Sequence, residues 1–559
     1  MTDSQANAST DSREGPDAPS RLDAIPGMGF ALIAALIPAA AVAIVYGAVR
    51  DHGFVWDDGL LSTGSVYRDC DLIAIFTTAA NSFEYLPVRD LTLCIDHAVF
   101  RTSPGGFHLM NVFYFMLASV LVGSLYRTLF AKAGIAAVAE NAPVYSLLAT
   151  LVFVLHPLQV EPVAFITARN ALLALLFVLA TLVSYARFLE TSNRGYYLLS
   201  VAFTALALFS KATALPVALL VAVLHYYLAR NDGVVRSWLR ALPHLLVTVL
   251  AGILHGVNAS THGAMNASLS LGEVIARLPR ALFIPQFYLY KFVWPANQSV
   301  EYVLTGVRDH MLFFGTTTLI LGLGCAALLL RSFRTRGLPG VLCAGLLLAL
   351  LPVSNIFPTH PSVADRYAQI PLLFMTPLLM LPAFMGLKRT AVLGLTLPII
   401  ALLAGLSFRQ VPVWKSDETI FAHAVAVDPT AVESISNLAL TRWYRGDEAA
   451  ALEAFALLAE QLPMDGQPAL FQAWYAVHAE DYETAEGLLE IAEKLGVARY
   501  FVHIVKAEMY SQQRLTRGAI REYERAGVEA QKLFQRDATA RAYLYRIDKA
   551  LRRLRAKVR

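Results

Sequence analysis

Two adjacent carboxylates follow the first apolar stretch of the sequence, in the triplet Trp56-Asp57-Asp58. Ionised groups beside a hydrocarbon layer are costly unless they find water, a partner or a substrate. A carboxylate at this place can take a proton from a hydroxyl nucleophile, which is general-base chemistry. The pair can also hold a divalent cation, because hard cations prefer oxygen ligands. The alternative is a solvated loop with an interfacial tryptophan.

Three cations lie at the ends of later apolar stretches. The guanidinium fork of Arg169 suits a phosphate group, and Arg366 with Tyr367 offers a cation beside a hydroxyl donor. Lys211 interrupts a long apolar run, so it either faces the same site or extends its amine to the membrane surface. Asp365 can pair with Arg366 in a purely structural role. Cations placed in this way stabilise a phosphate leaving group as its charge develops.

Two further polar patches lie at the ends of apolar runs. His108 and Asn111 are one helical turn apart and share a face, which favours a role in orienting the loop. His156 and Glu161 lie in a proline-containing turn, Leu155-His156-Pro157-Leu158-Gln159-Val160-Glu161-Pro162. They either bond to each other and fix that turn, or act directly at the site.

Composition places this chemistry in a membrane protein. Of 559 residues, 56% are hydrophobic and 16% charged, with a mean hydropathy of +0.52, which excludes an ordinary soluble protein. The net charge of +4 is small and spread along the chain, so we expect no nucleic-acid partner. Four widely spaced cysteines form neither a zinc motif nor a disulfide framework. Cys70 and Cys94 share one predicted outer loop, where they are either a disulfide or two free thiols.

Uncharged apolar runs predict eleven membrane spans. The first, residues 26–49, is too long for a signal-peptide core and is expected to be retained. The stretch 281–304 contains prolines and polar aromatic residues, so we expect it to be interfacial or re-entrant. The other spans centre near residues 116, 151, 178, 203, 221, 249, 321, 347, 377 and 399.

The basic loops predict the orientation of these spans. Arginines and lysines gather in alternate loops, which the positive-inside rule assigns to the cytoplasm. The carboxylate pair, the three cations and the C-terminal region are then all extracytoplasmic. The basic loop residues are Arg127, Lys132, Arg187, Arg194, Arg230, Arg236, Arg240, Arg331, Arg334, Arg336, Lys388 and Arg389.

A period of 34 residues runs through the C-terminal region. Small and large apolar residues recur at this spacing, which predicts tetratricopeptide repeats stacked as an α-solenoid over residues 416–530. A generic helical bundle is the alternative. Such a solenoid would present a concave surface to an extended peptide. The recurring residues are Ala439, Ala451, Phe455 and Leu458, then Ala473, Ala485, Leu489 and Ala492, then Ala507, Ala519, Tyr523 and Ala526.

The predicted fold is therefore all-α, a polytopic helical membrane domain followed by a helical solenoid. Residues 1–25 read as a disordered cytoplasmic tail, 26–409 as the membrane domain, and 531–559 as a basic capping helix after the repeats.

The order of the motifs resembles the transmembrane and tetratricopeptide-repeat O-mannosyltransferases and their bacterial relatives, over about residues 26 to 530. That family belongs to the GT-C class of integral-membrane glycosyltransferases. This sequence departs from the family pattern at Phe115, where a histidine is common, and at Leu86, where many members have arginine. The matching motifs are Trp56-Asp57-Asp58, Pro87, Asp96, Phe107-His108, Asn111, His156 to Glu161, Ser210-Lys211, Leu351 to Asn355 and Arg366-Tyr367.

The resemblance implies an inverting transfer of mannose or another hexose from a polyprenyl-phosphate donor to a hydroxyl, usually on a protein. It assigns the base to Asp57 or Asp58, with Asp57 favoured because related enzymes often use the first acid of such a pair. Donor phosphate binding falls to Arg169, Lys211, Arg366 and Tyr367. Residues expected to shape the site are Trp56, Arg89, His108, His156 and Glu161.

The acceptor is expected to be a protein or peptide docked by the repeats, in a setting of membrane lipid. A bacterial inner membrane with the repeats in the periplasm is favoured over the endoplasmic reticulum. Whether a metal at Asp57 and Asp58 takes part stays open. The alternative function is a non-catalytic membrane scaffold whose repeats recruit protein partners.

Overall fold

The computed structural model describes residues 24–59, 61, 65–77, 85–261, 271–304, 311–356, 362–462, 466–533 and 538–558. Over these residues the chain is helical and contains no strand, so the all-α prediction is confirmed. The predicted disordered tail lies outside the described residues up to position 23, and helix α1 begins at Ala24.

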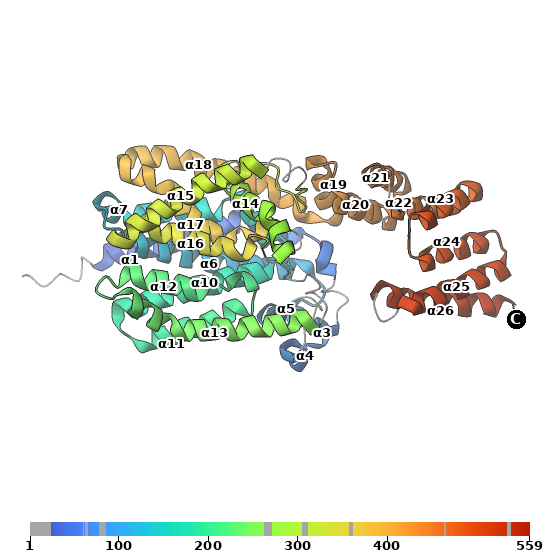
Figure 1. Ribbon diagram of the computed structural model, residues 1–559, viewed down its shortest axis with the longest axis horizontal. Coiled ribbons are helices and arrows are strands. Elements are labelled where there is room, and N and C mark those ends of the chain that lie inside the picture. The colour runs from blue at the N-terminus through green and yellow to red at the C-terminus, as the bar shows by residue number, and fades with distance from the viewer. Residues whose placement is uncertain are drawn as a thin grey trace, which may run out of the picture.

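A bundle of apolar helices forms the first part of the molecule (Figure 1). Among the described residues, seven helices are long and apolar enough to cross a membrane, and the pair Ala142–Val154 and Pro157–Ala164, bent by 61°, is either an eighth, broken span or a re-entrant loop. Three shorter apolar helices complete the set, and each of the eleven predicted centres falls on one of these elements. The chain is thus a multi-pass membrane protein. The bundle helices are α1 (Ala24–Tyr46), α6 (Pro104–Ala131), α8 (Ala142–Val154), α9 (Val160–Ala164), α10 (Arg169–Thr191), α11 (Arg194–Leu208), α12 (Val217–Leu228), α13 (Val234–Thr261), α15 (Met311–Thr335), α16 (Leu338–Leu350), α17 (Gln369–Gly386) and α18 (Arg389–Gln410).

Short helices and turns connect the bundle helices. Helix α14 (Leu271–Val293) contains two internal prolines and is not among the helices that meet the criteria for a span, so its interfacial placement stays a prediction. The others are η1 (Gly47–Asp51), η2 (Trp56–Asp58), α3 (Ser65–Asp69), α4 (Leu72–Thr77), α5 (Pro87–Phe100), α7 (Ala136–Glu140), η3 (Pro157–Gln159), η4 (Ala212–Ala214), η5 (Leu351–Val353), η6 (Asp365–Tyr367) and η7 (Val411–Lys415).

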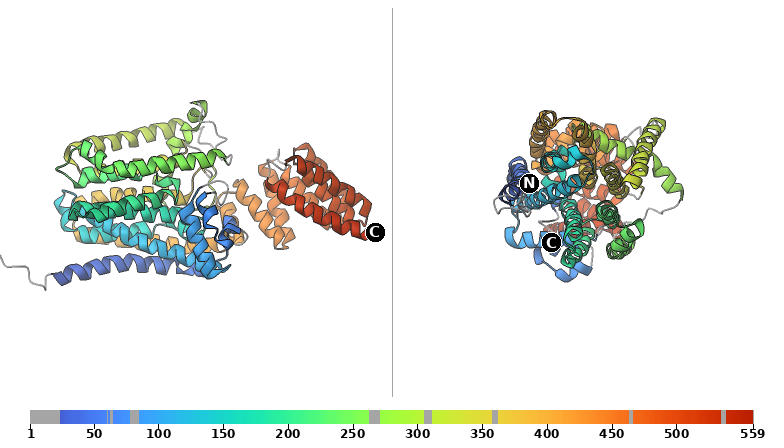
Figure 2. Two further views of the ribbon diagram at one scale, coloured as in Figure 1. Left: turned by 90° about the horizontal axis from the view of Figure 1, so that it is seen from below. Right: turned by 90° about the vertical axis from the view of Figure 1, so that its left-hand side faces the viewer.

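One end of the bundle carries the turns η2 and η6 together with the start of the C-terminal helices. We call it the site end, and Figures 1 and 2 show the C-terminal helices extending from it. The Gly53 amide donates to the Lys415 carbonyl at 3.0 Å, so the segment after α1 and the segment after α18 lie side by side there. The opposite end, where α12 turns into α13, is called the basic end.

The C-terminal helices pack as successive antiparallel pairs. The residues at the predicted packing positions are buried, including Ala439, Ala473 and Ala507, and a left-handed glycine, Gly446, separates α20 from α21. This is the arrangement that the repeat hypothesis expects, and the tetratricopeptide assignment itself stays a prediction. The helices are α19 (Asp417–Val427), α20 (Val432–Tyr444), α21 (Glu448–Gln461), α22 (Gln467–His478), α23 (Tyr482–Lys494), α24 (Arg499–Gln512), α25 (Thr516–Leu533) and α26 (Ala538–Val558).

A disulfide fixes the loop between α1 and α6. Cys70, which follows α3, is bonded to Cys94 in α5, with the two Cα atoms 5.3 Å apart. Of the two alternatives that the sequence left open, the structure has the disulfide. The bridge ties α3 to the helix that carries Arg89 and Asp96, two of the side chains near the candidate site.

Candidate functional site

The turn η2 places the two acids in different surroundings. Asp58 is fully buried, and its carboxylate accepts hydrogen bonds from the Thr167 amide at 2.8 Å, the Thr167 hydroxyl at 2.7 Å and the Val55 amide at 3.3 Å. Burial raises the pKa of Asp58 to about 7, although these donors act in the opposite direction. Asp58 therefore ties the turn to the segment before α10 and is not placed to meet a substrate.

Asp57 is the acid that a substrate can reach, because its side chain is exposed. Surrounding protein atoms desolvate its carboxylate and raise its pKa, while the positive charges of Arg366 and Arg89 partly offset that rise. Asp57 thus lies in the electrostatic field of two predicted site cations. A basic, accessible carboxylate in such a field fits a general base.

Trp56 holds the turn in a strained backbone conformation. Its φ is +49°, a region that costs a residue with a β-carbon about 1–2 kcal/mol. The Trp56 amide donates to the Asp417 carboxylate at 2.7 Å. Its indole stacks on Phe165 at 5.7 Å between ring centroids and meets the edge of Phe421 at 6.4 Å. Helix α19 of the C-terminal region therefore helps to hold the residue next to Asp57.

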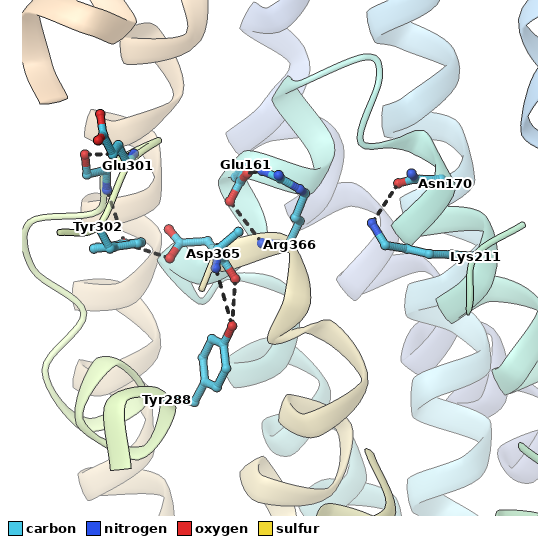
Figure 3. A network of polar contacts seen from close by, with 10 residues as sticks. Glu161, Asn170, Lys211, Tyr288, Glu301, Tyr302, Asp365 and Arg366 are labelled. Carbon is cyan, nitrogen blue, oxygen red and sulfur yellow. Dashed lines mark hydrogen bonds and ion pairs between the residues drawn. The ribbon is translucent and has the colours of Figure 1, made fainter. Parts of the chain in front are cut away.

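Arg366 is fixed from two sides in η6. Its guanidinium forms an ion pair with Glu161, and its backbone amide donates to the same carboxylate at 3.0 Å. Asp365 does not take the predicted role of ion-pair partner, because its carboxylate accepts a hydrogen bond from the Tyr302 hydroxyl at 2.7 Å. Figure 3 shows this network joining α9, η6 and the segment after α14. Burial, together with the charge of Glu161, raises the pKa of Asp365.

Of the two alternatives for His156 and Glu161, the structure does not have the hydrogen bond between them. Glu161 pairs with Arg366, and the His156 ring instead contacts the Phe292 carbonyl at 3.0 Å and accepts from the Leu158 amide at 3.2 Å. The ring also stacks on Phe292. His156, which lies at the break between α8 and η3, therefore connects this bent helix pair to α14.

Lys211 and Arg366 approach one aromatic ring. The Lys211 ammonium lies 5.2 Å from the centroid of Tyr367, and the Arg366 guanidinium lies 5.3 Å from the same centroid. The ammonium also donates to the Asn170 side chain at 3.2 Å and is almost fully buried, so Lys211 does not extend to the membrane surface. A small cavity lies beside this group, and Thr213, Arg366 and Tyr367 contribute to its wall.

The contacts of Arg169 differ from those expected of a side chain that binds the donor phosphate. It is fully buried, its guanidinium forms an ion pair with Asp96 at 2.5 Å, and it donates to the Asn111 side chain at 2.7 Å and the Phe107 carbonyl at 2.8 Å. These contacts occupy the fork that was expected to bind phosphate. Arg169 therefore positions the start of α6 against α10, and Asn111 serves the same packing.

Arg89 and His108 act on the turn η2 or on the segment before it. Arg89 is buried in an ion pair with Asp90 at 2.6 Å, and its charge reaches Asp57. His108 contacts the Gly53 carbonyl at 3.1 Å, three residues before Trp56. His108 therefore contacts the segment before the turn, Arg89 acts on Asp57 through its charge, and a site-shaping role for both stays a prediction.

Three functional contacts were missed by the sequence analysis. Thr167, Tyr302 and Asp417 bind Asp58, Asp365 and the Trp56 backbone across long stretches of chain. None belongs to a short motif. Of the three, only Thr167 could have been suggested by the sequence, because it lies two residues before the candidate residue Arg169.

A metal site is not evident among the described residues, where no group of three or more His, Cys, Asp or Glu side chains could hold an ion. The oxygens of Asp58 are already bound by protein donors. A divalent cation at Asp57 and Asp58 stays a prediction, and no step below uses one.

The fold and the site together define a class: a multi-pass membrane protein with an accessible carboxylate and two cations at one end of its helix bundle. Comparison with known proteins then gives relatives. The chain is 23% identical to protein O-mannosyl-transferase F38B6.6 of Caenorhabditis elegans over 411 residues, which cover 69% of this chain and 56% of that protein. It is 32% identical to protein O-mannosyl-transferase TMTC4 of Mus musculus over 183 residues, covering 32% of this chain and 23% of that protein. The human TMTC4 protein is 28% identical over 182 residues, again 32% of this chain and 23% of that protein.

The resemblance drawn from the order of the motifs is confirmed, since these relatives all carry the name protein O-mannosyl-transferase. The chain spans about half the length of the nematode relative and less of the mouse and human ones. No family model matches the sequence.

Proposed function

We propose that this chain is a membrane glycosyltransferase that moves mannose or another hexose from a polyprenyl-phosphate donor to a hydroxyl of a protein acceptor. The names of its relatives support transfer to protein. The arrangement of Asp57, Arg366, Lys211 and Tyr367 supports the chemistry.

Asp57 is the proposed general base. It takes the proton from the acceptor hydroxyl as that oxygen attacks the anomeric carbon, and the bond from that carbon to the donor phosphate breaks. A raised pKa makes the carboxylate a better proton acceptor near neutral pH. Attack in one step from the side opposite the phosphate inverts the anomeric centre.

Arg366 and Lys211 are the proposed phosphate-side cations. Both lie within about 5 Å of the Tyr367 ring, so they stabilise charge in one small region as polyprenyl phosphate leaves. Glu161 and Asn170 hold the two cations in place beforehand, which avoids reorganisation during the reaction. Arg169, which is committed to Asp96, is left out of this set.

The acceptor is proposed to dock on the C-terminal helices. Asp417 and Phe421 of α19 contact Trp56, so a peptide held by those helices starts next to the base. The bias of basic loops supports an extracytoplasmic site, and a bacterial inner membrane is favoured over the endoplasmic reticulum.

The single observation that carries this proposal is the exposed, electrostatically paired Asp57 beside a buried, hydrogen-bonded Asp58. Asp57→Asn should lower transfer by about 10²–10⁴-fold without loss of folded protein, because it removes a proton acceptor and keeps the shape. The measurement is mass spectrometry of exported proteins from a deletion strain complemented with each variant. The readout is a hexose on Ser, Thr or Tyr.

Asp51→Asn is the matched control. Asp51 is also exposed and lies six residues before Asp57, but it pairs only with Arg50 in the contacts described. It should leave transfer unchanged. Wild-type transfer by Asp57→Asn would refute the base assignment. If Arg366→Gln were silent as well, while loss of the C-terminal helices abolished function, the scaffold hypothesis would replace the enzyme.

A further inference from the structure

A cavity lies between four membrane helices, away from the proposed active site. It measures about 450 Å³ and opens between α12 and α13 on one wall and α15 and α16 on the other. Its lining is almost entirely apolar, with Leu219, Val223 and Leu348 among the residues that form it. Small residues, Ala222 and Ala344, leave the space between the helices.

The cavity ends at the basic end of the bundle. Arg336, in its lining, donates to the Ala229 carbonyl at 3.0 Å and the Asp232 carbonyl at 2.6 Å, both in the turn between α12 and α13. Figure 1 places that turn at the end opposite the C-terminal helices. The guanidinium also lies 4.4 Å from the centroid of Tyr226, so its position is fixed.

Two exposed arginines flank this end. Arg236 precedes the lining residue Ser237, and Arg331 precedes the lining residue Ser332. Arg236 has an ion-pair partner in Asp232 at 2.7 Å, and His225 also contacts that carboxylate. The rim therefore carries the three arginines Arg236, Arg331 and Arg336 and the single carboxylate of Asp232, which leaves it positive.

We propose that this cavity binds an anionic phospholipid, with one acyl chain between the helices and the phosphate at the arginine rim. Helices α13 and α15 are candidate membrane spans and α12 and α16 are shorter apolar helices, so the hydrocarbon chain of a membrane lipid is the occupant that fits this lining. Basic pockets between membrane helices on the side of the anionic leaflet bind lipid headgroups in this way. The inference is independent of the proposed transfer reaction.

Native mass spectrometry tests it on the full-length protein purified in detergent. The protein is incubated with dioleoyl phosphatidylglycerol or with dioleoyl phosphatidylcholine, and the lipid that stays bound is counted. Arg236→Gln with Arg331→Gln should lower retention of phosphatidylglycerol by about fivefold for each charge removed and leave phosphatidylcholine unchanged. Ala344→Phe should lower retention of both lipids, because the ring fills the cavity.

Two variants serve as controls. Arg187→Gln removes an exposed arginine near the same end that does not line the cavity, and Ala401→Phe adds a ring to an exposed position of α18. Both should bind lipid like the wild type. Equal retention of the two lipids by the wild type would overturn the proposal, as would wild-type retention by Ala344→Phe. Binding of a polyprenyl phosphate with no binding of phosphatidylglycerol would overturn it too, since the occupant would then be a different lipid.

Discussion

Two arginines at each end of the membrane bundle have contrasting surroundings. At the site end, Arg169 is buried and Arg366 is half-buried, and each is paired with a carboxylate. At the basic end, the side chains of Arg187 and Arg236 are 58% and 65% exposed. The same residue type therefore builds structure at one end and a charged surface at the other.

This difference in burial determines how much each ion pair contributes to the stability of the fold. Exposed ion pairs add little to stability, about 0–1 kcal/mol, because water screens them and side-chain entropy opposes them. A buried pair loses its hydration, so breaking it strands a charge, whereas removing both partners costs less. The pairs at the site end fix side-chain positions: Glu161 holds Arg366, and Asp96 of α5 holds Arg169 at the start of α10.

The largest expected effect is at Arg169. Arg169→Gln strands Asp96 in the interior and should lower the free energy of unfolding by about 3–5 kcal/mol. Arg187→Gln at the other end should change it by less than about 0.5 kcal/mol. Thermal unfolding in detergent, followed by size-exclusion chromatography, measures both.

A double variant distinguishes a stranded charge from lost packing. Arg169→Gln combined with Asp96→Asn removes both charges, so it should recover part of the stability lost in the single variant. If the double variant were no more stable than Arg169→Gln, the large effect of Arg169→Gln would not come from its ion pair with Asp96, and the contrast between the two ends would need another explanation.

The sequence predicted the helices of this fold because apolar run length is a local property. Each predicted span centre falls on an apolar helix, and Lys211 and Arg366 lie near one another at one end of the bundle. The partners of those charges were not predictable in the same way. Which side chain meets Arg169 depends on the rotation of α5, α6 and α10, and Asp417 reaches Trp56 across 361 positions.

The second prediction concerns pH and again contrasts the two ends. The folded protein raises the pKa of Asp58 to about 7 from its usual 3.8. The folded state therefore binds the proton more tightly, and the stability contributed by this group falls as pH rises from about 4 to about 7. Asp58→Asn removes that dependence, so the unfolding midpoint of the variant relative to the wild type should rise over this window.

Asp232 at the basic end should behave in the opposite sense. Its hydrogen bond with Arg236 lowers its pKa, so its contribution is present at neutral pH and is lost as pH falls below the usual range of a carboxyl group. Asp232→Asn should thus differ most from the wild type at neutral pH. If the unfolding midpoints of Asp58→Asn and Asp232→Asn, each relative to the wild type, changed in the same direction with pH, the contrast between these two carboxylates would be contradicted.

The smallest expected effect lies where the C-terminal helices join the site end. Glu301 accepts hydrogen bonds from the Ser434 amide at 2.7 Å and hydroxyl at 2.8 Å, at the start of α20, and the next residue, Tyr302, binds Asp365. Ser434→Ala removes only the hydroxyl bond and should lower the free energy of unfolding by about 1 kcal/mol. Ser511→Ala is the control, because the hydroxyl of Ser511 bonds within its own helix.

The functional consequence of that small loss is more informative than its size. Glu301 holds α20 against the segment whose next residue, Tyr302, binds Asp365, and Asp417 of α19 holds the turn that carries Asp57. If the C-terminal helices present the acceptor at a fixed distance from the base, Ser434→Ala should slow transfer to a folded protein acceptor more than transfer to a short peptide. If transfer to the folded protein and transfer to the short peptide were slowed equally, the Glu301–Ser434 contact would support the bundle and would not orient the acceptor.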